Sequence, residues 1–426
     1  MIMATSLGYI ESQVFPRVRN SVPTRAAEIF ENCFSDTLQS TVTVDENDSA
    51  FMVTGDISAM WLRDSTWQLY PYLRFLNADK HLQRLVAQVS RRQQAYVLID
   101  PYANAFNPAS NAAGHQDDHT MMSPWIWERK YEVDSLCAPI YLAYALWSRT
   151  GETSHLHDFE QVLQTILTVW RIEQHHDAQS TYLFERDHPF KPSDTLGRNG
   201  KGPESGFTGM TWSAFRPSDD ATAYGYNIPD NAYAVLVLRH AAAIVHEVHH
   251  NEALQQQALE LADEIEQGIL THGIVSVPGI GDIYAYEVDG LGNSILMDDA
   301  NLPSLLSLPF LGWDIDDDTY RRTREYILSP SNPFWYEGAC AQGIGSPHTP
   351  ENYVWPIALS IQGLTSNDAG EREQILKTLS QTDAGTGLMH ESFDVNDSQS
   401  YTRPWFSWAN AMFCEFVLNY SGFDAD

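Results

Sequence analysis

Apolar side chains recur every three or four residues in about a dozen segments of the chain, a spacing typical of amphipathic α-helices. These segments are 25–43, 58–76, 80–98, 132–149, 155–176, 228–250, 252–271, 301–311, 317–328, 354–364, 370–381 and 404–420. Strand-like alternation is confined to short pieces such as residues 283–288 in the turn-flanked sequence GIGDIYAYEVDG. The pattern therefore predicts an all-α protein with minor β-hairpins.

Long loops rich in Pro, Gly, Asn, Asp and Trp separate the predicted helices, at 99–127, 186–227, 273–300 and 330–353. Loops of this length in a compact domain usually carry function. Because no linker or low-complexity tract marks a boundary, we expect residues 1–426 to form a single domain. Six helical hairpins in a toroid, the (α/α)6 barrel, would use twelve helices and place the loops on one face. The helix count suggests this architecture without proving it.

The composition narrows the class of ligand. The chain has 426 residues, 56 Asp and Glu against 25 Lys and Arg, and a formal charge of -31, while 43% of it is hydrophobic. So much apolar side chain excludes disorder, and the acidic surface disfavours nucleic acid and anionic membranes as partners. A neutral or cationic small ligand fits the charge better.

The N-terminal residues lack the basic start and apolar run of a secretory signal, and no later stretch has the length of a membrane span. We therefore expect a cytoplasmic protein. We further expect it to be a monomer or a weak homo-oligomer. The cysteines, at positions 33, 137, 340 and 414, are far apart and form no CxxC pair. This spacing predicts buried, reduced thiols.

Two histidine-rich segments resemble metal sites. Residues 246–250, HEVHH, match the H-E-x-x-H zinc pattern. However, the apolar stripe of that helix runs through Val237, Ala241, Ile244, Val245 and Val248. This phase places His246 and His250 toward solvent and favours a histidine-rich helix end. Residues 115–119, HQDDH, could hold a cation or form an ordinary solvated loop, and the second interpretation is favoured.

Other segments combine groups suited to sugar binding. Trp61, Arg63 and Asp64 bring together an indole face for a pyranose and a guanidinium–carboxylate pair for adjacent hydroxyls, although a local ion pair at a helix start explains them equally well. The sequence RPSDD ends in Asp219 and Asp220, whose mutual repulsion would raise at least one pKa, as a general acid requires. The same residues could instead cap a helix.

Further candidates lie toward the C-terminus. MDDAN is another adjacent acidic pair, containing Asp298, and GIGSPHTP is a rigid turn that presents His348. Glu391 is an isolated acid among Gly and aromatic residues, where it can stay ionised and act as a base toward water. The sequence contains no nucleophile elbow, Walker loop or dinucleotide fingerprint, which argues against the common serine-hydrolase, nucleotide-binding and dinucleotide-binding functions. Two separated carboxylates with aromatic and hydroxyl-binding partners are what glycoside hydrolysis needs.

With these motifs in view, the chain resembles glycoside hydrolase family 125, the exo-acting α-1,6-mannosidases. The resemblance rests on GDISAMWLRDS, DPYANAFN, SPWIWERKYEVDSLC, FTGMTWSAFRPSDDA, YAYEVDGLGN, MDDANLPSLLSLP, GIGSPHTP, TDAGTGLMHESF and TRPWFSWAN, in one order from about residue 50 to 410. It implies an (α/α)6 barrel and inverting hydrolysis of terminal α-1,6-linked mannose in an α-mannoside oligosaccharide, without a metal or other cofactor. The family's general acid falls on Asp219 and its general base on Glu391. The implied substrate contacts are Trp61, Arg63, Asp64, Glu128, Arg216, Asp298 and His348.

Two other functions compete with this one. A non-catalytic mannoside-binding protein on a hydrolase scaffold would keep the aromatic and Arg–Asp contacts but would not need both carboxylates. A zinc peptidase would use the histidines of residues 246–250, and loss of activity on chelation would reveal it.

Overall fold

The computed structural model describes residues 8–45, 48–313 and 317–423, and most of them are helical. A π-helical turn, Ile10–Val14, leads into the first helix. The helices are α1 (Phe15–Ser21), α2 (Thr24–Ser40), α3 (Leu62–Leu69), α4 (Lys80–Ile99), α5 (Val133–Thr150), α6 (Phe159–Glu173), α7 (His176–Gln179), α8 (Gly197–Gly200), α9 (Ile228–Glu247), α10 (Glu252–His272), α11 (Leu308–Leu311), α12 (Asp317–Ile327), α13 (Pro356–Leu364), α14 (Ala369–Gln381) and α15 (Ser407–Tyr420).

Two of the predicted helical segments differ from the structure, and the pattern did not predict the helical residues 10–21 or the short helices α7 and α8. Residues 58–76 divide into a short strand, α3 and a 3₁₀ turn. The prediction for 301–311 is wrong except at α11, because Pro303 and Pro309 lack the N–H that a continuous helix needs. Within residues 10–21, Pro16 lies near the start of α1, where a missing N–H is tolerated. The other predicted segments coincide with helices to within a few residues.

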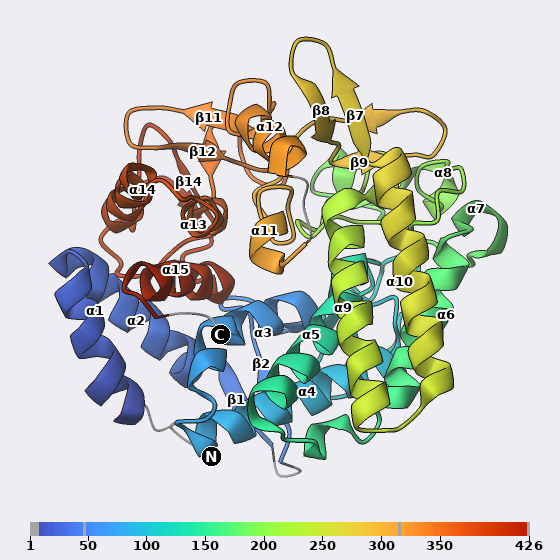
Figure 1. Ribbon diagram of the computed structural model, residues 1–426, viewed down its shortest axis with the longest axis horizontal. Coiled ribbons are helices and arrows are strands. Elements are labelled where there is room, and N and C mark those ends of the chain that lie inside the picture. The colour runs from blue at the N-terminus through green and yellow to red at the C-terminus, as the bar shows by residue number, and fades with distance from the viewer. Residues whose placement is uncertain (1–7, 46–47, 314–316, 424–426) are drawn as a thin grey trace.

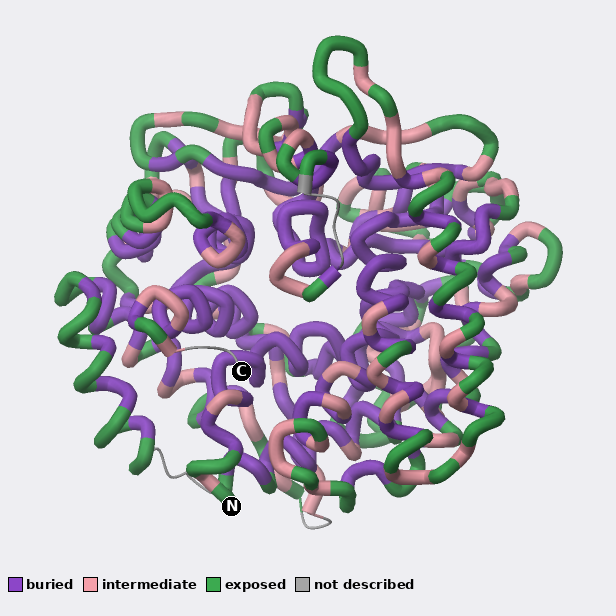
Figure 2. The backbone as a smooth tube through the Cα atoms, viewed as in Figure 1, coloured by how far each residue is buried: buried purple, intermediate pink, exposed green. Residues whose placement is uncertain are grey.

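Successive helices pack around the molecule until the last one meets the first ones. Helix α5 packs against α3 and α9, α13 packs against α15, and α15 packs against both α2 and α3. All eight residues of α3 are buried, as is most of α9 and α15, whereas α10 buries one apolar face (Figures 1 and 2). The buried helices are therefore covered on more than one side by their neighbours.

Small antiparallel sheets brace the long loops. The sheet order is β1–β2, β3–β4–β5, β10–β9–β6, β7–β8, β11–β12 and β13–β14–β15. The strands are β1 (Val42–Val44), β2 (Ala50–Met52), β3 (Met60–Trp61), β4 (Ala105–Phe106), β5 (Ile126–Glu128), β6 (Tyr226–Asn227), β7 (Ile274–Val277), β8 (Gly281–Tyr284), β9 (Glu287–Val288), β10 (Ser294–Ile295), β11 (Trp335–Glu337), β12 (Gln342–Ile344), β13 (Tyr353–Val354), β14 (Ser392–Asp394) and β15 (Tyr401–Thr402). The alternation at 283–288 falls in β8 and β9. The predicted minor β-structure is confirmed.

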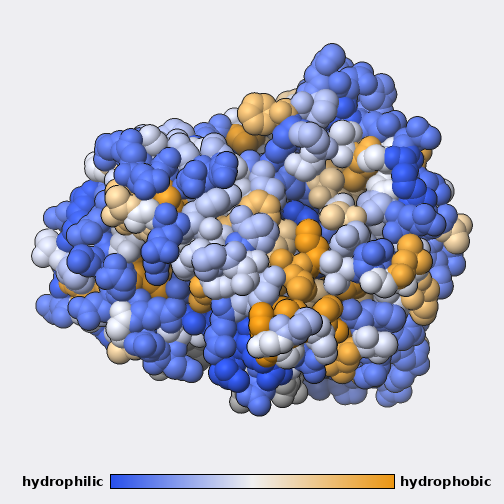
Figure 3. Space-filling model, turned by 90° about the horizontal axis from the view of Figure 1, so that it is seen from above, coloured by the Kyte–Doolittle hydropathy of each residue, from blue (hydrophilic) through white to orange (hydrophobic). Residues whose placement is uncertain are grey.

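The surface is mainly polar. Seen from above, hydrophilic side chains cover most of the face and hydrophobic ones gather near its middle (Figure 3). Within the described ranges, no helix combines the length and apolar character that crossing a membrane requires. All four cysteines are free, but the prediction that all are buried is wrong for Cys340, which is exposed in the β11–β12 connection.

Candidate active site

A pocket of about 180 Å³ brings together most of the predicted site residues. Its lining consists of Ile57, Trp61, Arg63, Asp64, Pro217, Ser218, Asp219, His348, Trp355, Glu391, Arg403, Phe406 and Trp408. These residues come from the start of α3, the loop after α8, the loops flanking β13 and β14, and the start of α15. Segments more than 300 positions apart in the sequence therefore line the same pocket.

Asp219 lies in a tight turn whose two ends pair with each other. Phe215 and Ala221 form an isolated β-bridge, and the Asp219 N–H donates to the carbonyl of Arg216 at 2.9 Å. The backbone of Asp219 has φ +66°, a left-handed conformation that Asp tolerates better than most residues. No helix begins here, since α9 starts at Ile228, so the alternative that this acid caps a helix is wrong.

The two acids of this turn point to different partners. The Asp219 carboxylate accepts from Arg63 at 3.4 Å, and Lys130 Nζ donates to the Asp219 carbonyl at 2.8 Å. Asp220 instead pairs with Lys191 at 2.7 Å and with His348 at 3.7 Å.

These partners reverse the pKa shift expected from repulsion between the two acids. Burial opposes ionisation at both positions, but Arg63 and Lys130 outweigh it and hold the pKa of Asp219 well below its ordinary value. Burial is likewise outweighed at Asp220, where His348 and Lys191 lower the pKa to about 2. Carboxylate repulsion therefore does not supply a protonated acid at this turn.

Glu391 reaches the pocket from the end of a strand. It directly precedes β14, and the register of β14 with β15 sets Ser392 opposite Thr402. The next residues along, Glu391 and Arg403, form an ion pair at 3.8 Å. The Glu391 side chain is 8% exposed, which leaves it a limited contact with the pocket space. A carboxylate beside one guanidinium at this distance can accept a proton from water.

Arg63 organises the floor of the site. Its guanidinium contacts Glu132 at 2.7 Å, Asp134 and Asp64 at 3.3 Å, and Asp219 at 3.4 Å. It also lies over the Trp408 ring, 5.2 Å from the centroid. Burial raises the pKa of Asp64 to about 6 against the opposing charge of Arg63. One buried cation thus holds acids from three segments of the chain in place.

Comparison with known proteins identifies the family. The model of the family described as "Metal-independent alpha-mannosidase (GH125)" matches residues 24–418. This chain belongs to that family. The α-mannosidase is therefore a glycoside hydrolase, as the sequence motifs predict.

Similar proteins support the assignment of the α-mannosidase to this family. A Streptococcus pneumoniae metal-independent α-mannosidase, in a non-productive complex with α-1,6-mannobiose, is 48% identical, with a TM-score of 0.95 over 99% of this chain and 100% of that one. The Meiotically up-regulated gene 157 protein of Schizosaccharomyces pombe is 40% identical over an alignment of 421 positions that covers 92% of this chain and 82% of the relative. A bacterial glucoamylase complexed with acarbose is 14% identical, with a TM-score of 0.63 over 97% of this chain and 58% of that one. This last likeness concerns the fold alone, which is mostly helical and similar to that of glucoamylase.

Three predicted substrate contacts of the α-mannosidase are not among the pocket-lining residues. Arg216 pairs with Glu287 at 2.5 Å, and Asp298 accepts from the N–H groups of Leu305 and Leu306 at 2.8 and 3.0 Å. Glu128 belongs to the charge network described next. The geometry gives these three side chains bracing roles, and their contact with sugar stays a prediction.

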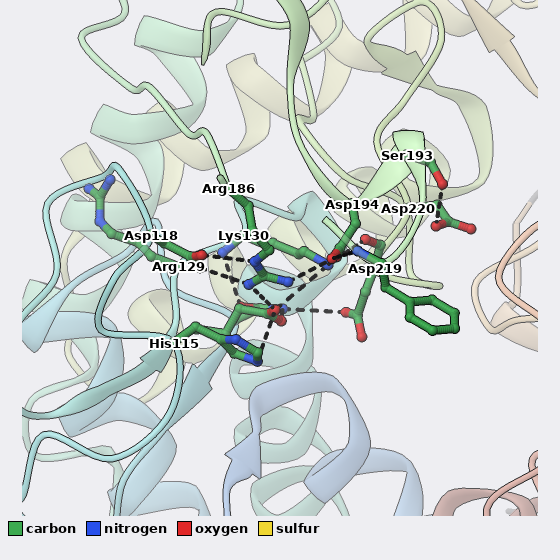
Figure 4. A network of polar contacts seen from close by, with 12 residues as sticks. His115, Asp118, Arg129, Lys130, Arg186, Ser193, Asp194, Asp219 and Asp220 are labelled. Carbon is green, nitrogen blue, oxygen red and sulfur yellow. Dashed lines mark hydrogen bonds and ion pairs between the residues drawn. The ribbon is translucent and has the colours of Figure 1, made fainter. Parts of the chain in front are cut away.

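The charge network joins two long loops to the turn that carries Asp219 (Figure 4). Arg186 donates to Asp118 at 2.7 Å, to Glu128 at 2.9 Å and to Asp194 at 2.9 Å. Lys130 Nζ lies 2.7 Å from Asp194 as well as bonding to the Asp219 carbonyl. The loops 115–130 and 186–194 are therefore tied to the backbone of the candidate acid.

Sequence reasoning assigned no role to several pocket residues. Trp355, Arg403, Phe406 and Trp408 line the site, and Arg403, Phe406 and Trp408 occur in the quoted string TRPWFSWAN. The aromatic density of that string was the available signal. Ile57, Pro217 and Ser218 gave no chemical signal, because they contribute shape more than reactive groups.

The two histidine-rich segments form no metal site in the described part of the chain, where no group of three or more His, Cys, Asp or Glu side chains is arranged to hold a metal ion. Helix α9 ends at Glu247, so His246 and His250 do not share a continuous helical turn, and both are exposed. In the other segment Asp118 is engaged by Arg186, and His119 pairs with Asp187 at 2.9 Å. The favoured interpretations, a helix end and a polar loop, fit these contacts.

Proposed function

We propose that this α-mannosidase removes terminal α-1,6-linked mannose from the non-reducing end of an oligosaccharide, with inversion at the anomeric carbon. The observation that carries the proposal is the presence of Asp219 and Glu391 in one pocket with Trp61, Arg63 and Asp64. The relative that is 48% identical was solved with α-1,6-mannobiose, which supports the linkage.

The size of the pocket supports exo action. At about 180 Å³ it is smaller than the roughly 300–1,000 Å³ of typical drug-sized sites. A space of this size suits one sugar ring at the end of a chain. Trp61 and Trp408 offer indole surface to such a ring, while Arg63 and Asp64 offer a donor and an acceptor to its hydroxyls.

The mechanism is a single displacement. Asp219, once protonated, gives its proton to the glycosidic oxygen as the C1–O bond breaks. Glu391, ionised, takes a proton from the water that attacks the opposite face of C1. The Arg403 guanidinium lies 3.8 Å from the Glu391 carboxylate.

The fold proposal follows the same resemblance. We infer an (α/α)6 barrel, formed as one catalytic domain, in which α3, α5, α9, α11, α13 and α15 form the inner ring. The sequential packing of α15 on α3, α3 on α5, α5 on α9 and α9 on α11 supports this arrangement.

The test is a panel of α-1,2-, α-1,3- and α-1,6-linked mannobioses, with NMR of the first product anomer. We expect turnover of the 1,6 isomer with initial release of β-mannose. Initial release of α-mannose would contradict inversion, and preference for another isomer would contradict the linkage.

The role of Glu391 is tested by Glu391→Gln. This change should leave binding of α-1,6-mannobiose within a few-fold of wild type, measured by calorimetry, while turnover falls at least about 100-fold because the general base is lost. Retained turnover would refute the assignment. The exposed Glu337→Gln is the control and should behave as wild type.

A further inference from the structure

Asp219 has a second, fully buried carboxyl beside it. Glu132 immediately precedes α5, and its side chain is 0% exposed, whereas that of Asp219 is 23% exposed to the pocket. The two carboxyl groups lie side by side, because Arg63 and Asn104 each donate to both of them. Two carboxyl groups held this close favour retention of one proton between them, because ionisation of both would place two like charges side by side.

The same two donors bind both carboxyl groups. Arg63 donates through Nη1 to Glu132 at 2.7 Å and through Nη2 to Asp219 at 3.4 Å. The amide of Asn104 donates to Glu132 at 3.3 Å and to Asp219 at 3.4 Å. Ser135 donates a further bond to Glu132 at 2.8 Å. The pair is therefore held in fixed geometry from α3, α5 and the segment before β4.

The charges around the pair favour retention of a proton. The charged and titratable groups that interact with Glu132 or Asp219 are Arg63 and Asp64 of α3, Asp134 of α5, Lys130, Tyr182 and His348, and Asp230 of α9 interacts in turn with Asp134 and Arg63. Arg63 alone contacts four carboxyl groups. Since buried like charges cannot all ionise, at least one acid of this cluster stays neutral.

The two members of the pair differ in environment. Burial raises the pKa of Glu132 well above its ordinary value, opposed by Arg63 and reinforced by Asp219. Arg63 and Lys130 lower the pKa of Asp219 despite its burial. Without substrate the shared proton therefore lies on Glu132, although the proposed general acid is Asp219.

We propose that Glu132 is a positioning residue that stores the catalytic proton and passes it to Asp219 when substrate binds. The inference rests on the proposed role of Asp219 as general acid. Substrate in the pocket excludes water from Asp219, which favours its neutral form. The proton passes from one carboxyl group to the other, which Arg63 and Asn104 hold side by side.

The proton balance closes over one turnover. The proton moves from Glu132 to Asp219 and then to the glycosidic oxygen, so the pair ends with both carboxylates ionised. Glu391 gains one proton from the attacking water. After the products leave, Glu391 releases that proton to solvent and the pair takes one up, which restores the starting state.

The experiment compares two substrates that differ in their need for an acid. The alkoxide of α-1,6-mannobiose must be protonated as it leaves, whereas fluoride leaves from α-mannosyl fluoride without a proton from Asp219. Both substrates still need Glu391 to activate water. The variants are Glu132→Gln, Asp219→Asn and, as the matched control, Glu287→Gln, another fully buried glutamate paired with an arginine.

For Glu132→Gln we expect kcat/KM on mannobiose to fall at least about 100-fold at pH 7, the usual contribution of a general acid. On the fluoride it should stay within a few-fold of wild type. The alkaline limb of the pH profile on mannobiose should move to lower pH, because Asp219 alone beside Arg63 and Lys130 loses its proton sooner. Glu287→Gln should change both substrates by the same factor and leave the limb in place.

Failure of the inference and failure of the proposed function give different results. If Asp219→Asn loses mannobiose activity selectively but Glu132→Gln lowers both substrates equally with an unmoved limb, the proton-storage role is overturned and the general acid stands. If Asp219→Asn lowers both substrates equally, the general-acid assignment fails, and the inference fails with it.

A second variant covers the case in which Glu132→Gln does not fold. Ser135→Ala removes one donor to the Glu132 carboxylate, which disfavours the ionised form. The alkaline limb should then move to higher pH, opposite to the shift in Glu132→Gln. An unmoved limb, or a shift to lower pH, would overturn the proposal.

Discussion

At the scale of single residues, the acids of this protein differ because burial and partners act in opposite directions. Asp298 and Asp289 both accept hydrogen bonds from backbone N–H groups. At Asp298 burial dominates and raises the pKa to about 8. At Asp289 burial also acts to raise the pKa, but hydrogen bonds from Asn293 and Leu291 outweigh it and lower the pKa. Similar bonds therefore accompany opposite pKa shifts, according to whether burial or the hydrogen bonds have the larger effect.

Asp298→Asn is expected to change the pH dependence of stability. In the unfolded chain this acid ionises near pH 4, whereas in the fold it keeps its proton to about pH 8. At low pH the protonated carboxyl group of Asp298 does not destabilise the fold. As the pH rises from the unfolded-state pKa to the folded-state pKa, the unfolded chain ionises first, and the free energy of unfolding therefore falls. Because Asn does not titrate, the free energy of unfolding of the variant should rise relative to that of wild type by on the order of 1 kcal/mol per pH unit between these two pKa values. Above the pKa of the folded state the difference should stay constant.

Urea unfolding at pH 5, 6.5, 8 and 9 measures this difference. Asp289→Asn is the control, since the lowered pKa of Asp289 places its titration below this range. Parallel curves for Asp298→Asn and wild type would contradict the assignment.

At the scale of elements, side-chain caps decide where several helices begin. Asp79 accepts from the N–H groups of His81 and Leu82 at the start of α4, at 2.9 and 3.2 Å. Asn251 accepts from Leu254 at the start of α10, at 3.0 Å. This second cap starts a new helix directly after residues 246–250, and since α9 already ends at Glu247, the H-E-x-x-H pattern does not lie on one helix.

Asp79→Ala should reduce the free energy of unfolding by about 1 kcal/mol, because two N–H groups at the start of α4 lose their acceptor. The start of α4 is not part of the pocket, so kcat/KM should not change. Urea unfolding and a mannobiose assay measure the two quantities. Asp79→Asn keeps an acceptor, so its free energy of unfolding should lie within a few tenths of a kcal/mol of the wild-type value. An equal loss of unfolding free energy in both variants would argue against capping.

At the scale of the whole molecule, closure of the chain and completion of the pocket depend on the same contacts. Gly55 and Phe406 form a β-bridge, Ser407 N–H donates to the Thr54 carbonyl at 2.8 Å, and Arg403 binds Asp56. The pocket wall takes residues from both of these segments. Opening this seam would therefore separate two walls of the site.

Gly55→Ala tests this seam. Gly55 has φ +132°, and an added Cβ would lie 2.2 Å from the Trp405 carbonyl oxygen. Since backbone must shift to relieve the clash, we expect a loss of about 1–3 kcal/mol in unfolding free energy together with a fall in kcat/KM.

Gly279→Ala is the matched control for this prediction. Gly279 has φ +81°, and no atom lies within 4 Å of its added Cβ. It should show backbone strain of about 1–2 kcal/mol with unchanged kcat/KM. If Gly55→Ala lost stability but kept its activity, the contacts that close the chain would not be needed for the pocket, and the prediction would be wrong.

Much of this protein is determined by local sequence. The helical spacing predicts α4, α5, α9 and α10 because each buries a face that repeats along its own length. The motif strings identify the family and name the two carboxylates, Asp219 and Glu391, since these depend on residue identity and order. Pro303 and Pro309 show where local reasoning can also correct a helix that spacing alone predicts.

Tertiary structure decided which charged groups meet and in what state. Glu128, Arg216 and Asp298 lie in motif strings as prominent as that of Arg63, but their partners come from other loops. Asp219 has its pKa lowered by Arg63, 156 positions away, and by Lys130, 89 positions away. Glu132 stands unremarked in its string until folding sets it beside Asp219. A carboxyl group's charge depends on burial and on groups within a few ångströms, and only the folded chain brings those groups together.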